Sequence, residues 1–187
     1  MCELCLSLSA KKSEFFITNI IFAGSRVSPS GVQSDSTKLT AVVDWHQPPD
    51  LLNLSHFLCL TGYFHDLVKN YARIAQPLSV LIRRADIPKG AGKAAYCAAL
   101  SKIKLANTWT QMHATAFLNL KKALTSNPML KAPRFDGTPF VVTSDGCKEG
   151  FGEMLTQQFK QMHPGGKTTK RLHPITFTSK CTSPSEA

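Results

Sequence analysis

Two cysteines near the start of the chain, Cys2 and Cys5, have a spacing that could hold a metal ion. A Cys-x-x-Cys pair supplies half of many zinc sites, and two further Cys or His ligands complete the tetrahedron. The other four cysteines are far apart, and no second close pair or spaced His pair accompanies the first. The sequence therefore favours free thiols in a reducing compartment over a zinc site.

A small basic run at residues 89–93, Lys-Gly-Ala-Gly-Lys, is a second candidate, because glycine-rich loops before a lysine can cradle phosphate groups. The full pattern, Gly-x-x-x-x-Gly-Lys-Ser/Thr after a strand, is absent here. We therefore exclude a nucleotide-binding loop.

The third feature is an excess of positive charge. Lys and Arg number 22 against 12 Asp and Glu, which gives a formal net charge of +10. Such a surplus favours a polyanionic partner, nucleic acid before membrane, although solvated cations that bind nothing are the simpler alternative.

Targeting signals are weak. No apolar run approaches the ~20 residues that span a bilayer, so we expect no membrane partner. The mildly apolar start, residues 1–10, lacks a preceding positive charge, and Lys11 and Lys12 follow it instead. We expect an intracellular protein, in the cytoplasm or nucleus, that is not secreted.

The elements that must position any functional residues begin with strands. With 187 residues and 43% hydrophobic content, the chain can form one medium domain or two small ones. An apolar run at 15–22 and a turn at 28–31 predict a β-hairpin over residues 14–33, which the turn ends. Gly24 would allow a positive φ or a close approach of the backbone.

Helices follow. Asp35 is expected to cap a helix over 35–45 with Leu39, Val42 and Val43 on one face, and Asp50 to cap a longer helix. Its apolar stripe runs from Leu54 to Tyr71, with Gly62 as a slight weakness. Pro77 is expected in the first turn of a further helix. A flexible basic segment is expected at 85–108, with a short helix near 94–102.

In the last third of the chain, the spacing of the apolar residues changes from that of helices to that of strands. Thr110 caps a helix with a stripe that includes Met112, Phe117 and Leu120. Strands are predicted at 140–143 (buried, ending at 144–146), 150–159 and 173–179, with a basic loop at 160–171. Short connections between successive strands predict an antiparallel meander, so the fold class is α+β.

Six motifs occur in an order that resembles the Pol polyprotein of Ty3/gypsy-type LTR retrotransposons, especially fungal ones. They are Phe-Ala-Gly-Ser-Arg-Val-Ser-Pro-Ser-Gly-Val (22–32), Lys-Leu-Thr-Ala-Val-Val-Asp-Trp (38–45), Phe-Leu-Cys-Leu-Thr-Gly-Tyr-Phe (57–64), Ile-Ala-Gln-Pro-Leu (74–78), Ala-Phe-Leu-Asn-Leu-Lys-Lys-Ala-Leu-Thr-Ser (116–126) and Pro-Phe-Val-Val-Thr-Ser-Asp-Gly (139–146). The resemblance extends from about residue 12 to the end of the chain.

The resemblance implies an organisation into five parts. Residues 1–13 form an N-terminal tail, 14–33 a primer-grip-like hairpin at the end of the palm, 35–84 a helical thumb-like bundle, 85–108 a basic linker, and 109–187 a truncated RNase H-like domain. The implied architecture is a hairpin and a helical bundle, followed by an incomplete RNase H-like meander of three antiparallel strands.

The resemblance also assigns site residues. Asp145 corresponds to the first RNase H carboxylate, a catalytic group and metal ligand in an incomplete site; the family's enzymes hold two Mg²⁺ ions between carboxylates. The partner would be an RNA–DNA hybrid or another duplex. The residues expected to contact nucleic acid are Gly24, Arg26, Lys69, Arg73, Arg83, Arg84, Lys89 and Lys93.

Other residues that the family's catalysis needs are missing. The chain has no Asp-Asp pair for polymerisation, and Glu186 comes too early to be the next RNase H carboxylate. We therefore expect a reverse transcriptase/RNase H fragment that binds template–primer, holds Mg²⁺ weakly and is inactive alone. The alternative is a non-enzymatic module that binds nucleic acid or protein. An uncovered face of the meander could also lead to self-association.

Overall fold

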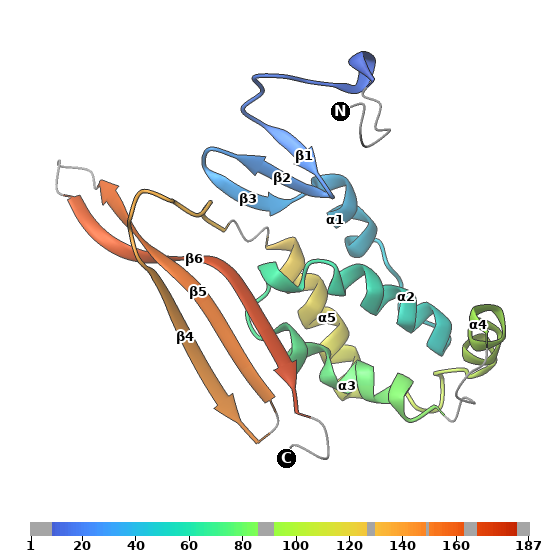
Figure 1. The fold of residues 1–187 in the computed structure, drawn as a ribbon. Helices are drawn as coiled ribbons and strands as arrows, with labels where there is room; N and C mark the ends of the chain where they lie inside the picture. The colour runs from blue at the N-terminus through green and yellow to red at the C-terminus, as the bar shows by residue number, and fades with distance from the viewer. Residues whose placement is uncertain (1–8, 86–91, 127–129, 149, 163–167, 183–187) are drawn as a thin grey trace.

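The computed structural model describes residues 9–85, 92–126, 130–148, 150–162 and 168–182. A helical bundle lies beside a large antiparallel sheet, and a small sheet lies next to the first helix of the bundle (Figure 1). The mixed helix-and-sheet class predicted from the sequence is confirmed.

The small sheet has three short antiparallel strands, β1 (Ile20–Phe22), β2 (Ser25–Ser28) and β3 (Gly31–Ser34), after a 3₁₀ turn, η2 (Ala10–Lys12). Ala23 and Gly24, with φ of 48° and 77°, form the two-residue turn between β1 and β2, so the positive φ expected at Gly24 is confirmed. Both central residues of such a turn need φ > 0 to match strand twist.

The predicted hairpin over 14–33 is wrong in extent. The turn at 28–31 joins β2 to β3 rather than ending the unit, since Ser28 pairs with Gly31. Phe15 and Phe16 lie before the sheet and are 74% and 104% exposed. They share the strand propensity of their neighbours, but they have neither a partner strand nor a core to pack on.

Five α-helices and a second 3₁₀ turn make the bundle in the described residues. They are α1 (Ser36–Val43), α2 (Leu51–Gly62), η3 (His65–Leu67), α3 (Tyr71–Arg83), α4 (Lys93–Lys102) and α5 (Gln111–Thr125). None of the helices in the described part of the chain is long and apolar enough to cross a membrane. Asp35 occupies the N-cap position of α1, as predicted.

Asp50 caps α2 as predicted. Its Oδ1 accepts hydrogen bonds from the Asn53 backbone N–H at 2.9 Å and the Asn53 side-chain amide at 2.8 Å, and its Oδ2 pairs with Lys104 Nζ at 3.2 Å. Burial alone would raise the pKa of Asp50, but these hydrogen bonds and the Lys104 charge outweigh it and lower that pKa. The carboxylate thereby joins α2 to the segment after α4.

The core joins α2, α3 and α5. Phe57 of α2 is fully buried, and its ring centroid lies 4.5 Å from that of Phe117 on α5. The other buried apolar residues are Val42, Leu51, Leu54, Phe64, Leu67, Val68, Ala75, Leu78, Leu100, Leu105, Ala116, Leu120, Leu124 and Leu130. Each helix therefore contributes part of a single core.

Three helical predictions are wrong. The stripe from Leu54 to Tyr71 does not lie on one helix, because α2 ends at Gly62 and α3 begins at Tyr71. Pro77 lies inside α3 rather than in its first turn, so it cannot donate to the Arg73 carbonyl as another residue would. Val43 and Met112 are 49% and 59% exposed, because they lie at helix ends beyond the packed face.

The segment after residue 92 packs on the bundle rather than forming a free linker. Leu100 and Leu105 are each 1% exposed. Backbone hydrogen bonds of 3.1 Å from Leu51 N–H to Ile103 and 3.0 Å from Leu105 N–H to Pro49 hold it beside the start of α2. The predicted short helix is confirmed as α4. Lys89 lies outside the described residues.

The large sheet is the predicted antiparallel meander, in the order β4 (Phe140–Cys147), β5 (Gly150–Met162) and β6 (Thr168–Cys181). The expected loop at 160–171 is wrong, because its described ends continue β5 and β6, with Lys160 opposite Lys170. Positions 144–146 lie within β4 rather than after it. Every residue of β4 is exposed, so the buried strand predicted there is also wrong: β4 is an edge strand.

The sheet joins the bundle through β6 and the start of α3. The Ala72 backbone N–H donates to Ser179 Oγ at 2.9 Å, and Cys181 Sγ donates to the Ala72 carbonyl at 3.3 Å. Phe177 of β6 packs against the bundle core. At the other end, Val32 and Leu130 exchange backbone hydrogen bonds of 2.8 and 2.9 Å, which tie the small sheet to the chain entering β4.

A pH prediction comes from the N-cap of α5. His113 is buried and accepts the Thr110 backbone N–H at Nδ1, 3.0 Å away, and burial lowers its pKa below 6.5. As the pH falls through 6.5, the unfolded chain takes up a proton before the folded chain does, so the free energy of unfolding falls. Glutamine can make the same reciprocal cap without titrating. We expect H113Q to show a flatter dependence between about pH 7.5 and 5.5 in urea unfolding. Equal slopes would contradict this role.

A second prediction concerns Gly150, where β5 begins. A Cβ there would lie 2.5 Å from the Lys180 carbonyl oxygen and 3.0 Å from Cys181 Cα, both backbone atoms that cannot move aside. We expect G150A to lower the free energy of unfolding by about 1–3 kcal/mol. G146A is the matched control in the same sheet, because its Cβ would meet only Phe151 Cβ at 4.0 Å. Equal losses in the two variants would show that the close approach is unimportant.

Candidate nucleic-acid interface

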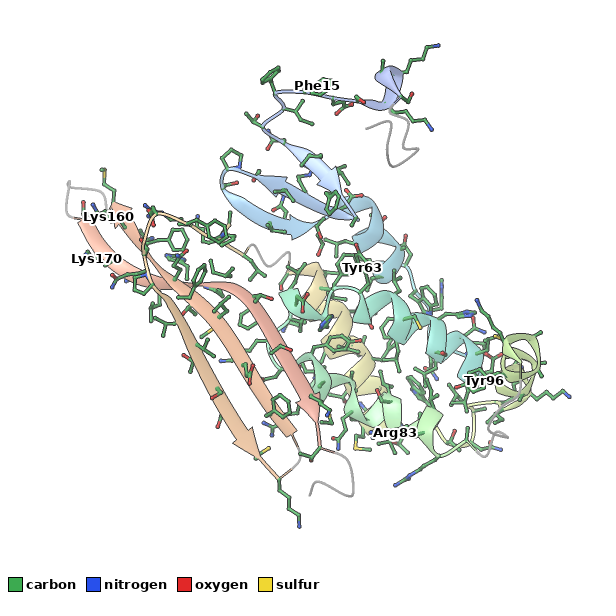
Figure 2. All side chains as sticks on the ribbon, in the orientation of Figure 1. Phe15, Tyr63, Arg83, Tyr96, Lys160 and Lys170 are labelled. Carbon is green, nitrogen blue, oxygen red and sulfur yellow. The ribbon has the colours of Figure 1, made fainter. Side chains whose placement is uncertain are left out.

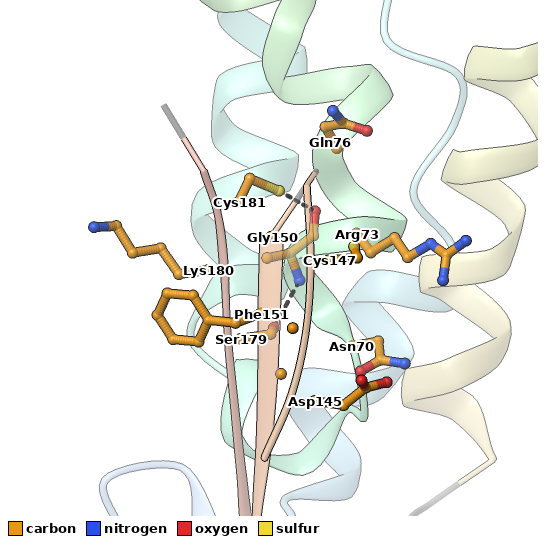
Figure 3. Close-up of a pocket in the computed structure, with 13 residues that line it drawn as sticks. Asn70, Arg73, Gln76, Asp145, Cys147, Gly150, Phe151, Ser179, Lys180 and Cys181 are labelled. Atoms are coloured by element: carbon orange, nitrogen blue, oxygen red, sulfur yellow. Dashed lines mark hydrogen bonds between the residues drawn. The ribbon is translucent and has the colours of Figure 1, made fainter. Parts of the chain in front are cut away.

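Asp145 lies at a pocket of about 130 Å³ between the start of α3 and the ends of the three large strands (Figure 3). It stands opposite Gly152 in the register of β4 and β5. A Cβ on Gly152 would lie 2.8 Å from Asn70 Oδ1, so the missing side chain lets Asn70 lie against the sheet. Asn70 has φ of 57°, a left-handed conformation that Asn tolerates, and directly precedes α3.

The pocket combines one carboxylate with polar and basic neighbours. Asn70, Arg73 and Lys180 line it together with Asp145. Among the residues that the structure describes, no group of three or more His, Cys, Asp or Glu side chains gathers where a metal ion could be held. A pair of catalytic Mg²⁺ ions needs several carboxylates, so the described residues around Asp145 do not fit that pair.

The candidate cations on and around α3 are exposed. Lys69 and Arg73 lie at its start, beside the Asp145 pocket, and Arg83 and Arg84 lie at its end. Arg83 borders a groove of about 360 Å³ between α3 and the end of β6, to which His65 and Lys180 also contribute. Cationic side chains therefore occupy both ends of one helix and the hollow beside it.

Lys69, Arg73, Arg83 and Arg84 have no carboxylate partner within the described part of the chain. The ion pairs found there join Lys104 to Asp50, Arg134 to Asp136, and His65 to Asp66. An exposed cation without an internal partner can neutralise a phosphate without first breaking a salt bridge. The α3 cations thus satisfy a basic requirement of a phosphate-binding surface.

The remaining predicted contacts lie elsewhere. Gly24 and Arg26 belong to the small sheet, which Figure 1 draws beside α1, with α2 between it and α3. Lys93 is the exposed first residue of α4. The structure therefore gathers Arg73 and Asp145 at one pocket, with Lys69 next to its lining residue Asn70 in the sequence, and does not bring the small-sheet residues to it.

Sequence reasoning missed Lys180, which lines both the Asp145 pocket and the groove beside α3. It also assigned no role to Lys160, Lys170 and Arg171 at the far end of the sheet. A signal was present, because residues 154–185 contain five Lys or Arg and no Asp or Glu.

Comparison with known proteins identifies the family. A family model described as "RNase H-like domain found in reverse transcriptase" matches residues 109–187. An uncharacterised mitochondrial protein of Arabidopsis thaliana is 35% identical over 133 residues, which cover 70% of this chain and 71% of that protein. The Pol polyprotein of the transposon gypsy from Drosophila melanogaster is 29% identical over 167 residues, 89% of this chain and 15% of that protein.

Solved structures agree on the fold. The foamy viral protease-reverse transcriptase in complex with an RNA/DNA hybrid superposes with a TM-score of 0.67 at 20% identity, over 94% of this chain and 20% of that one. The chain spans 14–15% of the length of the opus, gypsy and 297 transposon polyproteins it matches. With a family match over the sheet and its preceding helix, and relatives that extend across the bundle, the chain belongs to the Ty3/gypsy-like retroelement Pol family, and residues 109–187 are its reverse-transcriptase RNase H-like domain.

Proposed function

We propose that this chain binds a template–primer duplex, an RNA–DNA hybrid, through the cations along α3, and that it does not cleave the duplex by itself. The observation that carries the proposal is the set of exposed cations at both ends of α3 that no described carboxylate neutralises. Solved structures with this fold include the foamy viral protease-reverse transcriptase in complex with an RNA/DNA hybrid, named above, and the same enzyme in complex with double-stranded DNA.

The spacing of the cations fits a nucleic-acid backbone. Arg73 and Arg84 are separated by about 16 Å along the helix axis and lie on nearly the same side of it, because successive residues turn by about 100°. Phosphates on one strand of a duplex follow each other every ~3.4 Å along its axis. The two arginines therefore span roughly five phosphates of one strand.

Two other contacts belong to the proposal. Gly24 and Arg26, in the turn and second strand of the small sheet, would act as the primer grip, because the tight turn brings backbone to the surface. Lys93 would extend the basic surface beyond α3. These contacts require the duplex to pass over more than one side of the bundle.

The proposed lack of cleavage follows from the small number of metal-ligating side chains around Asp145. Asp145 supplies one carboxylate, and Arg73 beside it is a cation that opposes metal binding. We propose that Mg²⁺ is not held tightly by this chain alone, and that the Asp145 pocket contributes shape rather than chemistry to duplex binding.

The binding role predicts a charge-specific loss of affinity. R83A/R84A should weaken binding of a blunt RNA–DNA hybrid, measured by fluorescence anisotropy, and reduce the log–log salt slope by about 0.9 per lost contact. The charge-matched control is K11A/K12A, in the exposed turn η2. Equal affinities for R83A/R84A and the unaltered chain would contradict the proposal. That result would favour a module that docks on protein. Sedimentation would detect self-association of the chain through the exposed strand β4.

The second prediction concerns catalysis. Incubated with Mg²⁺, the purified chain should leave the RNA strand of a hybrid intact on a denaturing gel, because Asp145 lacks companion carboxylates among the described residues. D145N should bind the hybrid as the unaltered chain does. Cleavage that appears with the unaltered chain and disappears with D145N would contradict the non-catalytic role.

A further inference from the structure

The far end of the β5–β6 hairpin carries a second cluster of basic and aromatic residues. Figure 2 shows Lys160 and Lys170 at the end of the sheet away from Arg83. Lys160 stands opposite Lys170, and Phe159 stands opposite Arg171. Because neighbouring positions of a strand point to opposite faces, the lysine pair lies on one face and Arg171 on the other. Both faces of this end are therefore basic.

The lysine pair has no internal explanation. Like charges directly opposite each other on neighbouring strands destabilise a sheet. Lys160, Lys170 and Arg171 are exposed, and none takes part in an ion pair within the described residues. Residues 154–185 contain no Asp or Glu that could neutralise them. A bound polyanion would remove the repulsion.

Aromatic rings lie on the face that carries Arg171. Phe135 is 87% exposed, and its ring centroid lies 6.2 Å from that of Phe140, which is 42% exposed. Arg134 lies over the Phe159 ring at 5.8 Å, and His173 meets the same ring edge-on at 5.6 Å. This face therefore offers two exposed rings next to a layer of basic and aromatic side chains.

A buried amide anchors the backbone on either side of Phe135. Gln157 is fully buried on β5. Its Oε1 accepts the Arg134 backbone N–H at 2.8 Å, and its Nε2 donates to the carbonyls of Arg134 and Thr138, each at 2.8 Å. Phe135 lies between these two anchors. An exposed ring on an anchored backbone loses little freedom when a base stacks on it.

We propose that this end of the sheet binds a single-stranded nucleic-acid segment. Its bases stack on Phe135 and Phe140 beside Arg171, and its backbone crosses the edge of the hairpin so that Lys160 and Lys170, on the other face, meet its phosphates. A single strand fits better than a duplex, because only unpaired bases present their faces to aromatic rings. Lys160 lies eight positions along β5 from Gly152, the partner of Asp145, or roughly 26 Å. The inference rests on the proposed function in one respect: the single-stranded segment would be a continuation of one strand of the bound duplex.

The test measures binding of the full chain to a short oligothymidylate and, separately, to a blunt RNA–DNA hybrid. F135A should weaken oligothymidylate binding roughly 5- to 150-fold, the range seen when one stacking ring is removed. K160Q/K170Q should reduce the salt slope for the single strand by about 0.7 per lost contact. Neither variant should change binding to the blunt hybrid. F15A and K11Q/K12Q are matched controls, because they remove an exposed ring and two exposed cations elsewhere.

Two outcomes would overturn the inference. In the first, the chain binds the hybrid but not oligothymidylate, or F135A behaves as F15A does; this removes the single-strand site and leaves the proposed function standing. In the second, K160Q/K170Q weakens the blunt hybrid as much as the single strand, which makes this end a duplex contact. Loss of hybrid binding in R83A/R84A alone tests the proposed function separately. Circular dichroism of each variant checks that it is folded.

Discussion

The close approach between the start of α3 and the large sheet is the constraint on which the rest of the structure depends. Asn70 lies against Gly152, and Ala72 uses both its N–H and its carbonyl to bind Ser179 and Cys181 of β6. A Cβ at Gly152 would lie 2.8 Å from Asn70 Oδ1, so the Asn70 side chain would have to move away from the sheet. Because these contacts hold the start of α3 against the sheet, Arg73 lines the same pocket as Asp145.

The joined surface accounts for the proposed binding of a duplex without its cleavage, because the two need different groups. Electrostatic binding needs exposed cations at phosphate spacing, and a moderate number of them on rigid elements is sufficient. Phosphodiester cleavage by two metals needs several carboxylates converging within a few ångströms. The described residues meet the first requirement along α3, whereas around Asp145 they supply one carboxylate and an arginine.

Much of the fold was predictable from local signals, and the failures have physical causes. Asp50 and Thr110 precede apolar periodic runs, so both helix starts were correct. The break at Gly62 was missed because the apolar period continues across it into η3 and α3. The exposure of β4 could not be read from Phe140 to Thr143, since an edge strand and a buried strand share the same residue types. Of the site, motif resemblance found Asp145 and the α3 cations. Lys180 was missed because its position depends on long-range pairing.

Hydrogen–deuterium exchange of the chain, free and saturated with a blunt RNA–DNA hybrid, would show which elements the hybrid covers. We expect backbone amides in α3 and in the adjoining ends of β5 and β6 to gain protection together when the hybrid binds, because the junction makes them one surface. A hybrid that binds while protecting only the small sheet or α4, with α3 exchanging as in the free chain, would contradict this expectation.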